Sequence, residues 1–175
     1  MGLRPARCYR RIERPYTRVS RRREKAYVRG VPGSKIVHFN MGNPNGKFEY
    51  VLKLISKQDV QVRHNALEAA RIAANRILSK LGNDNYYFWI KVYPHHVLRE
   101  NPLATGAGAD RLQQGMRLAF GKPIGRAAQV EKGQEVMLVF VNEKGLETAK
   151  QALKQANYKL PFKGQIVIEK VTTSE

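Results

Sequence analysis

The sequence predicts an α+β fold in which two helices pack on a mixed, largely antiparallel sheet behind an extended basic N-terminal arm. Two windows, residues 63–81 and 143–156, place apolar residues at helical spacing. Several other windows alternate apolar with polar residues or are rich in β-branched and aromatic residues, which is typical of strands. Short turns separate some of these strands, which favours antiparallel pairing. The first 35 residues have neither period.

Residues 1–35 form the arm, which carries much of the positive charge. The arm contains twelve Lys or Arg residues and two acidic ones, out of 32 and 14 in the whole chain. Such a concentration needs a polyanion nearby, because otherwise it would repel itself. Tyr9, Tyr16 and Tyr27 lie between the cations and could stack on bases while guanidinium groups contact phosphates. We therefore expect an irregular segment that a nucleic-acid partner holds in place.

A globular domain is expected over residues 36–170. Residues 35–40 alternate as a short strand, and the turn-rich sequence MGNPNG follows at 41–46. Residues 48–55 form a strand that is partly apolar on both faces. The clearest helix spans 63–81 and ends at Gly82. Its apolar stripe consists of Leu67, Ala70, Ala74, Ile77, Leu78 and Leu81.

The next part of the domain is expected to be mostly strand, interrupted by one long loop. Residues 85–93 are the most aromatic window and are typical of a buried strand, with 96–99 as a short continuation. Residues 100–115 have no period, and a loop of this length in a compact domain is usually functional or disordered. Residues 125–130 and 135–141 form two strands, with a turn at 131–133 between them.

A helix and a strand are expected to complete the domain. Asn142 is a favourable N-cap for the helix at 143–156. The apolar stripe of this helix consists of Leu146, Ala149, Leu153 and Ala156. Residues 165–170 form the last strand, and the tail at 171–175 is expected to fray.

Enzymatic and metal-dependent functions find little support in the sequence. Cys8 is the single cysteine, and His95 and His96 would point to opposite faces of a strand, so no metal site is expected. The glycines at 106 and 108 lack the Gly-Lys-Ser/Thr ending of a phosphate-binding loop. The few carboxylates form no pair suited to acid–base catalysis, so we expect no enzyme and no cofactor.

The sequence also limits where the protein acts. It contains no apolar run of membrane-spanning length and no secretory signal, so we expect a cytoplasmic protein without a membrane partner. No homo-oligomer is expected.

The candidate RNA-binding residues are basic side chains of the arm and of the globular domain. Basic residues near the glycine-rich loop are included because glycine lets a backbone approach a ligand closely. The set is Arg4, Arg7, Arg10, Arg11, Arg14, Arg18, Arg21, Arg22, Arg23, Lys25, Arg29, Lys35, Arg63, Arg71, Arg99, Arg117, Lys122 and Arg126. The absence of zinc-finger, helix-turn-helix and other reader signatures favours a protein built into a large RNA over a sequence-specific DNA reader.

Three stretches resemble a known family. RPARCYRRIERPYTR at 4–18, HNALEAARIAANR at 64–76 and ADRLQQGMRLAFGKPIGRAAQVEKGQ at 109–134 are similar to the archaeal and eukaryotic large-subunit ribosomal protein L-ten-e, equivalent to bacterial L-sixteen. The similarity covers nearly the whole chain, and the length suits an archaeal member. Leu118 stands where the family often has glycine, and Gln129 where it often has a basic residue.

The resemblance implies a structural, rRNA-binding constituent of the large ribosomal subunit with an α/β hammerhead-like fold. It implies that the arm runs through rRNA and that the loop after Arg99 points toward the peptidyl-transferase region and the aminoacyl-tRNA site. Neighbouring ribosomal proteins are further expected partners. The residues expected to serve the tRNA site are Thr105, Gly106, Gly108, Asp110, Arg111 and Gln113. The alternative is an RNA-modifying enzyme or a free tRNA-binding factor with a basic extension.

Overall fold

The computed structural model describes residues 4–104, 106–117 and 119–171, and the side chains of Asp110 and Leu112 are outside this description. The body is built on a five-stranded sheet with the strand order β1-β4-β7-β2-β8. Every neighbouring pair in this sheet is antiparallel. The strands are β1 (Asn40–Gly42), β2 (Tyr50–Ser56), β4 (Tyr86–Ile90), β7 (Glu135–Val141) and β8 (Gly164–Lys170).

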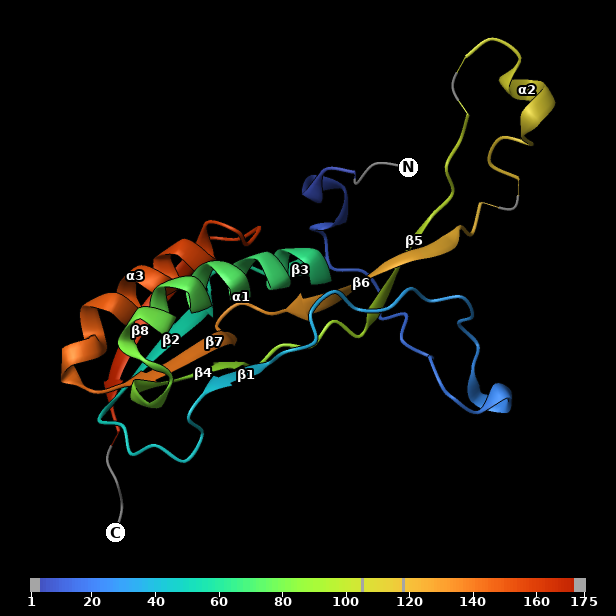
Figure 1. The fold of residues 1–175 in the computed structure, drawn as a ribbon. Helices are drawn as coiled ribbons and strands as arrows, with labels where there is room; N and C mark the ends of the chain where they lie inside the picture. The colour runs from blue at the N-terminus through green and yellow to red at the C-terminus, as the bar shows by residue number, and fades with distance from the viewer. Residues whose placement is uncertain (1–3, 105, 118, 172–175) are drawn as a thin grey trace.

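Two helices cover one face of this sheet (Figure 1). α1 (His64–Leu78) lies in the connection from β2 to β4, and α3 (Leu146–Asn157) lies between β7 and β8. This order of strands and helices is the split βαβ arrangement of ferredoxin-like folds, with β1 added at one edge. The chain passes from α1 into β4, which pairs with β7, and from α3 into β8, which pairs with β2. The two helices also pack against each other.

A second, three-stranded sheet is inserted into this plan. It has the order β3-β6-β5, also wholly antiparallel, and consists of β3 (Val60–Arg63), β5 (His96–Glu100) and β6 (Lys122–Val130). Beyond β5 and β6 the chain projects away from the body as a long loop that contains α2 (Ala109–Leu112) (Figure 1). Five short 3₁₀ helices complete the described structure: Ala6–Tyr9, Arg23–Lys25, Ser79–Leu81, Asn83–Asn85 and Glu143–Gly145.

The core lies between the five-stranded sheet and the helices. Leu52, Phe88 and Val139 come from the helix-facing side of adjacent strands and are fully buried. Leu67 of α1 and Leu153 of α3 meet them from the other side. The apolar faces predicted for both helices are therefore buried in this core, as expected. Ile77, Leu81 and Leu146 lie at the margins and are only partly buried.

The α+β class and the two helices are confirmed, but the sheet organisation differs from the expected single mixed sheet. Residues 96–99 do not continue the preceding strand, because they begin the second sheet. Likewise, the turn at 131–133 leads from β6 in one sheet to β7 in the other instead of closing a hairpin. Short connections imply antiparallel neighbours only when both strands stay in one sheet.

Several boundaries were also wrong. The strand expected at 35–40 overlaps β1 only at Asn40, and residues 41–42, expected in a turn, belong to that strand. β3 was missed because its four residues directly precede α1. Asn142 makes no side-chain cap; its carbonyl instead accepts a bond of 2.9 Å from the Gly145 N–H in a 3₁₀ turn. Of the tail, Val171 donates to the Glu49 carbonyl at 2.8 Å, and residues 172–175 lie outside the described chain.

Candidate nucleic-acid interface

The candidate interface consists of the arm and the three-stranded sheet under it. The outward path of the arm crosses this sheet from one edge to the other. The Arg10 carbonyl accepts a hydrogen bond of 2.9 Å from the Gln61 N–H of β3, and the Tyr16 carbonyl accepts one of 2.9 Å from the Val97 N–H of β5. Residues 10–16 are therefore fixed by backbone hydrogen bonds to the body.

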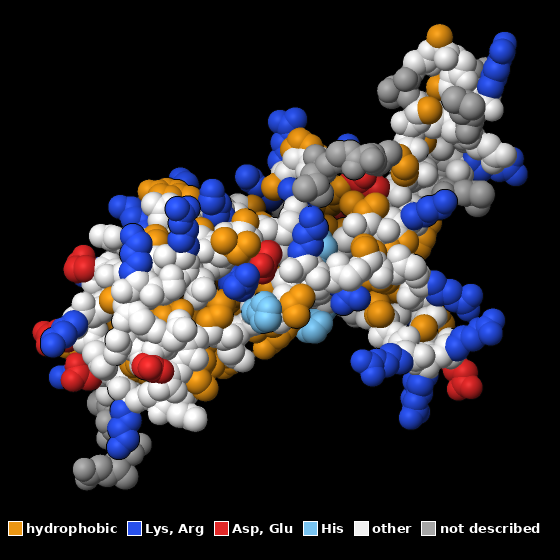
Figure 2. Space-filling view, in the orientation of Figure 1, with side chains coloured by type: hydrophobic (Ala, Val, Ile, Leu, Met, Phe, Trp, Pro, Cys, Tyr) orange, Lys and Arg blue, Asp and Glu red, His pale blue; other side chains and the backbone are white. Residues whose placement is uncertain are grey.

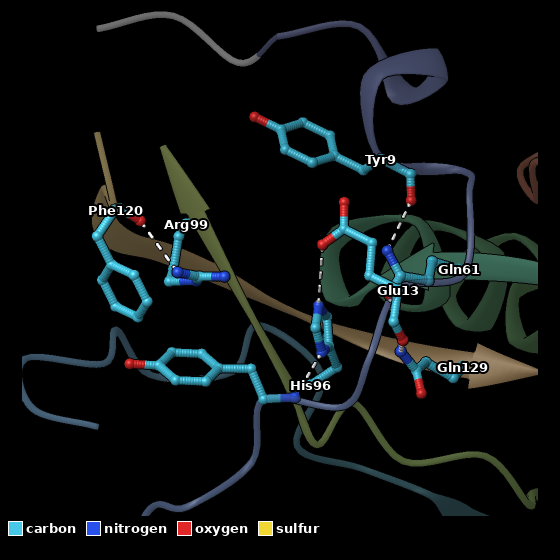
Figure 3. A network of polar contacts seen from close by, with 8 residues as sticks. Tyr9, Glu13, Gln61, His96, Arg99, Phe120 and Gln129 are labelled. Atoms are coloured by element: carbon cyan, nitrogen blue, oxygen red, sulfur yellow. Dashed lines mark hydrogen bonds and ion pairs between the residues drawn. The ribbon is translucent and has the colours of Figure 1, made fainter. Parts of the chain in front are cut away.

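Three side chains reinforce this crossing, those of Gln61, Gln129 and His96 (Figure 3). Gln61 is buried, and its Nε2 donates to the Tyr9 carbonyl at 3.0 Å. Gln129, on the central strand β6, donates from Nε2 to the Glu13 carbonyl at 2.7 Å and to Gln61 Oε1 at 3.0 Å. The neutral amide of Gln129 thus holds the arm in place and offers no charge to a partner.

His96 fixes the far end of the crossing. Its side chain is 4% exposed, and Nδ1 accepts a hydrogen bond of 3.0 Å from the Tyr16 N–H. Burial lowers the pKa of His96 below the ordinary histidine value of 6.5, the Glu13 carboxylate partly offsets this, and Arg99 lowers it further. His95 is exposed while His96 is buried, as expected for neighbours on opposite faces.

The return path of the arm lies on the opposite face of the same sheet. Arg126 and Gln129 are three residues apart on β6, so their side chains point to opposite faces. Arg126 Nε donates to the Pro32 carbonyl at 3.2 Å, and the Lys35 N–H donates to His64 Nδ1 at 3.1 Å. Ile36 then enters the main core at 2% exposure. The arm therefore wraps the sheet.

Between the two paths, residues 18–28 project as a loop closed by a 3.0 Å bond from the Val28 N–H to the Arg18 carbonyl. Lys and Arg side chains gather over this projection (Figure 2). The exposed basic residues on it are Arg18, Arg21, Arg22, Arg23 and Lys25, and Arg18 lies 5.0 Å from the Tyr27 ring centroid. Glu24 is its one acidic residue. Exposed cations on a backbone anchored at both ends form a surface suited to a polyanion.

The eighteen candidate RNA-binding residues divide into two groups. Fourteen are exposed: Arg4, Arg7, Arg10, Arg11, Arg14, Arg18, Arg21, Arg22, Arg23, Lys25, Arg29, Lys35, Arg117 and Lys122. Four are half-buried and have partners within the protein: Arg63, Arg71, Arg99 and Arg126. The side chains of the second group make hydrogen bonds within the protein, and the number of charges in the sequence did not distinguish them from the exposed cations.

Arg99 is the most enclosed of these four by aromatic contacts. Its guanidinium carbon lies 3.9 Å from the Phe120 ring centroid and 4.5 Å from that of Tyr16, and Nη1 donates to the Phe120 carbonyl at 3.1 Å. These contacts join the arm, β5 and the end of the projecting loop (Figure 3). Arg71 is different, because Nε and Nη2 bind the two carboxylate oxygens of Glu68 at 2.9 and 2.7 Å.

The projecting loop carries the residues expected near tRNA. Gln113 joins its two limbs, since Oε1 accepts from the Ala104 N–H at 2.5 Å and Nε2 donates to the Ala104 carbonyl at 2.8 Å. Arg111 is exposed on α2, and Gly106 and Gly108 have positive φ angles of 139° and 78°. Thr105 lies outside the described residues, as does the side chain of Asp110.

Sequence patterns missed a group of exposed apolar residues on and beside this loop. Met116 is 67% exposed and Phe120 is 66% exposed, with Leu103 and Ile124 less so. Their signal in the sequence was weak because they fall in a stretch without any period. Large apolar side chains on a projecting loop are typical of a contact surface.

Three further observations concern other kinds of site. No helix among the described residues is long and apolar enough to cross a membrane. Within the same residues, no three His, Cys, Asp or Glu side chains come together as metal ligands would. A hollow of about 1180 Å³ lies at the far end of the five-stranded sheet and is lined by Tyr87 and Phe140 together with both Lys and Glu residues.

Comparison with known proteins decides the family. The sequence model described as Ribosomal protein L16p/L10e matches residues 15–167. The chain belongs to the ribosomal protein L16p/L10e family. It is 54% identical over 172 residues to the large ribosomal subunit protein uL16 of Methanococcus maripaludis, covering 97% of this chain and 96% of that protein. It is 53% identical to the uL16 protein of Staphylothermus marinus and 48% identical to that of Archaeoglobus fulgidus, each over 171 residues, 97% of this chain and 95% of the relative.

The resemblance seen in the sequence is thereby confirmed, and family membership extends over both sheets. The matched residues 15–167 begin within the arm and include β5, the projecting loop and β6. The relatives match over nearly the entire length, so their similarity also covers most of the arm. In this L16p/L10e chain the stretch at 4–18 contacts the residue before α1 through the Arg63–Arg4 bond, and it contacts β6, within the stretch at 109–134, through the Gln129–Glu13 bond.

Proposed function

We propose that the protein is a structural constituent of the large ribosomal subunit, where it binds rRNA through the arm and the three-stranded sheet. Its relatives carry the name large ribosomal subunit protein uL16, and membership of the same family supports a structural rather than an enzymatic role. The expected partners are rRNA and neighbouring ribosomal proteins in the cytoplasmic ribosome.

One observation carries the rRNA-binding part of the proposal. The arm uses its backbone for hydrogen bonds and leaves its charged side chains outside: the Arg10 carbonyl accepts from β3 and the Arg18 carbonyl accepts from Val28 within the arm, while both side chains are exposed. Such an arm loses little conformational entropy on binding, because it is already ordered. Its cations can then neutralise phosphates and release counterions.

The projecting loop is proposed to work at the aminoacyl-tRNA site. The family resemblance supports this position, as do the exposed Arg111 on α2, which lies in the projecting loop (Figure 1), and the exposed Met116 and Phe120 that follow it in the chain. An arginine can fork onto phosphate or stack on a base, and an exposed aromatic ring can stack on an unpaired base. The RNA would catalyse peptide-bond formation, and the loop would help to position the RNA.

Sedimentation of a tagged protein tests the proposal. Cell extract is centrifuged through a sucrose gradient in moderate salt, and RNA crosslinked to the tagged protein is sequenced. We expect the protein to migrate with large subunits and to crosslink to large-subunit rRNA at arm residues. Migration at the top of the gradient, with crosslinks mainly to free tRNA, would support the alternative of a soluble tRNA-binding factor and refute this function.

A further inference from the structure

We propose that a small cationic cavity between the arm and one end of the two helices binds a single backbone phosphate of RNA. The inference rests on the proposed rRNA-binding function and adds to it one defined site. The cavity has a volume of about 150 Å³ and is lined by Arg10 of the arm, Arg63 at the end of β3, and Lys159 just after α3. A water molecule occupies about 30 Å³ in the liquid, so the space suffices for a hydrated or partly dehydrated oxyanion.

The charge of the cavity is unbalanced. Three cations from distant parts of the chain line it, and no carboxylate does. Among the described residues, none of the three forms an ion pair with Asp or Glu, although the same protein pairs Lys53, Lys91 and Lys150 with glutamates. Like charges brought together raise the free energy of the folded protein unless an anion lies between them. A bound phosphate would supply that anion.

Arg63 is held in a fixed orientation at this site. Its Nη1 donates to the Arg4 carbonyl at 2.8 Å, and its guanidinium carbon lies 5.3 Å from the Tyr9 ring centroid. A guanidinium held in this way is already oriented before an anion arrives, and its planar group of N–H donors suits a phosphate oxygen.

The remaining lining fits an anion as well. Ala66 in the first turn of α1 contributes to the wall, and α1 begins without a side-chain cap or an acidic residue in that turn. Free N–H groups at a helix start add positive potential. Leu160 and Pro161 form an apolar wall that limits water, which strengthens the attraction between a phosphate and the three cations.

Binding of the full-length protein to purified large-subunit rRNA, measured across a range of salt concentrations, tests the site. Lys159→Gln removes one cavity charge, and Lys163→Gln is the matched control, because Lys163 is also exposed but does not line the cavity. We expect Lys159→Gln to weaken binding roughly fivefold and to reduce the log–log salt slope by about 0.8. Lys163→Gln should change affinity less than about twofold, and both variants should melt like the wild type.

A double variant separates one shared phosphate from three independent contacts. If Arg10 and Lys159 bind the same phosphate, Arg10→Gln combined with Lys159→Gln should weaken binding by less than the product of the single effects. Equal behaviour of Lys159→Gln and Lys163→Gln, in a wild-type protein that binds rRNA, would overturn the cavity site alone. Failure of the wild-type protein to bind the rRNA would overturn the proposed function and this site together.

Discussion

At the scale of single residues, His96 makes stability depend on pH. Its folded-state pKa lies below 6.5 chiefly because it is buried, and its Nδ1 must stay unprotonated to accept the Tyr16 N–H. The unfolded chain therefore binds more protons below pH 6.5, so this contribution to stability is fully present above that pH and is lost as the pH falls below it. His64, whose pKa burial and Lys35 also lower, acts in the same direction.

We predict that the melting temperature falls between pH 7.5 and pH 5.5 and that His96→Asn reduces this fall. The asparagine Oδ1 can accept the same backbone hydrogen bond but does not titrate. The exposed neighbour His95→Asn is the control and should leave the pH dependence unchanged. Identical pH profiles for the wild type and His96→Asn would contradict the role given to the buried imidazole.

Two substitutions on α1 distinguish its inner and outer faces. Leu67 is fully buried against the sheet, so Leu67→Ala should lower the free energy of unfolding by roughly 2–5 kcal/mol. Arg71→Gln removes the bidentate pair with Glu68 on the helix surface and should cost at most about 1 kcal/mol. Denaturant titration measures both. Comparable losses would mean that the helix face is assigned wrongly.

At the scale of elements, the projecting loop should affect function more than stability. Arg111→Ala should leave the melting temperature unchanged, because the side chain is exposed. Gln113→Ala removes two hydrogen bonds to Ala104 and should loosen the loop locally. We expect ribosomes that carry either variant at full occupancy to accept aminoacyl-tRNA more slowly. An unaltered translation rate at full occupancy in the double variant would refute the proposed position of this loop.

The elements also indicate how far the sequence predicts the structure. Both helices and most strands followed from periodicity, because one apolar face must be buried whatever the topology. Division into two sheets did not follow, since the short connections at 57–59, 91–95 and 131–134 have the composition of ordinary turns. The partners of Gln61, Gln129 and His96 are arm backbone groups that lie from 52 to 116 residues away along the chain, and no local pattern encodes such contacts.

The exposed part of the candidate interface could be predicted, and the contacts inside the protein could not. The exposed arginines of the arm were evident from charge density alone, because cations without acidic neighbours need a polyanion. Arg63, Arg99 and Arg126 looked the same in sequence but bind carbonyl groups within the protein. Lys159 was not among the candidates, and only the folded chain places it beside Arg10 and Arg63.

At the scale of the whole molecule, the arm and the globular domain form one unit. The sequence divided the chain into an arm at 1–35 and a globular domain at 36–170. In the structure Val28 of the arm is buried, and the arm covers the polar side chains of Gln61 and His96. Removing the arm would therefore expose these groups and lower stability. A loss of RNA binding in such a truncated protein could not be separated from its loss of stability. Neutralising the charges of the projection at 18–28 avoids this problem, because its basic side chains are exposed.

The most direct test of the rRNA-binding surface is the salt dependence of binding to large-subunit rRNA. The variant replaces Arg21, Arg22, Arg23 and Lys25 with Gln, and the control replaces four exposed lysines outside the arm, Lys57, Lys144, Lys154 and Lys170. If each arm charge meets a phosphate, the log–log slope of the variant should fall by about 3, while that of the control should fall by less than about 1. Equal changes in slope for the two proteins would contradict an rRNA-binding arm.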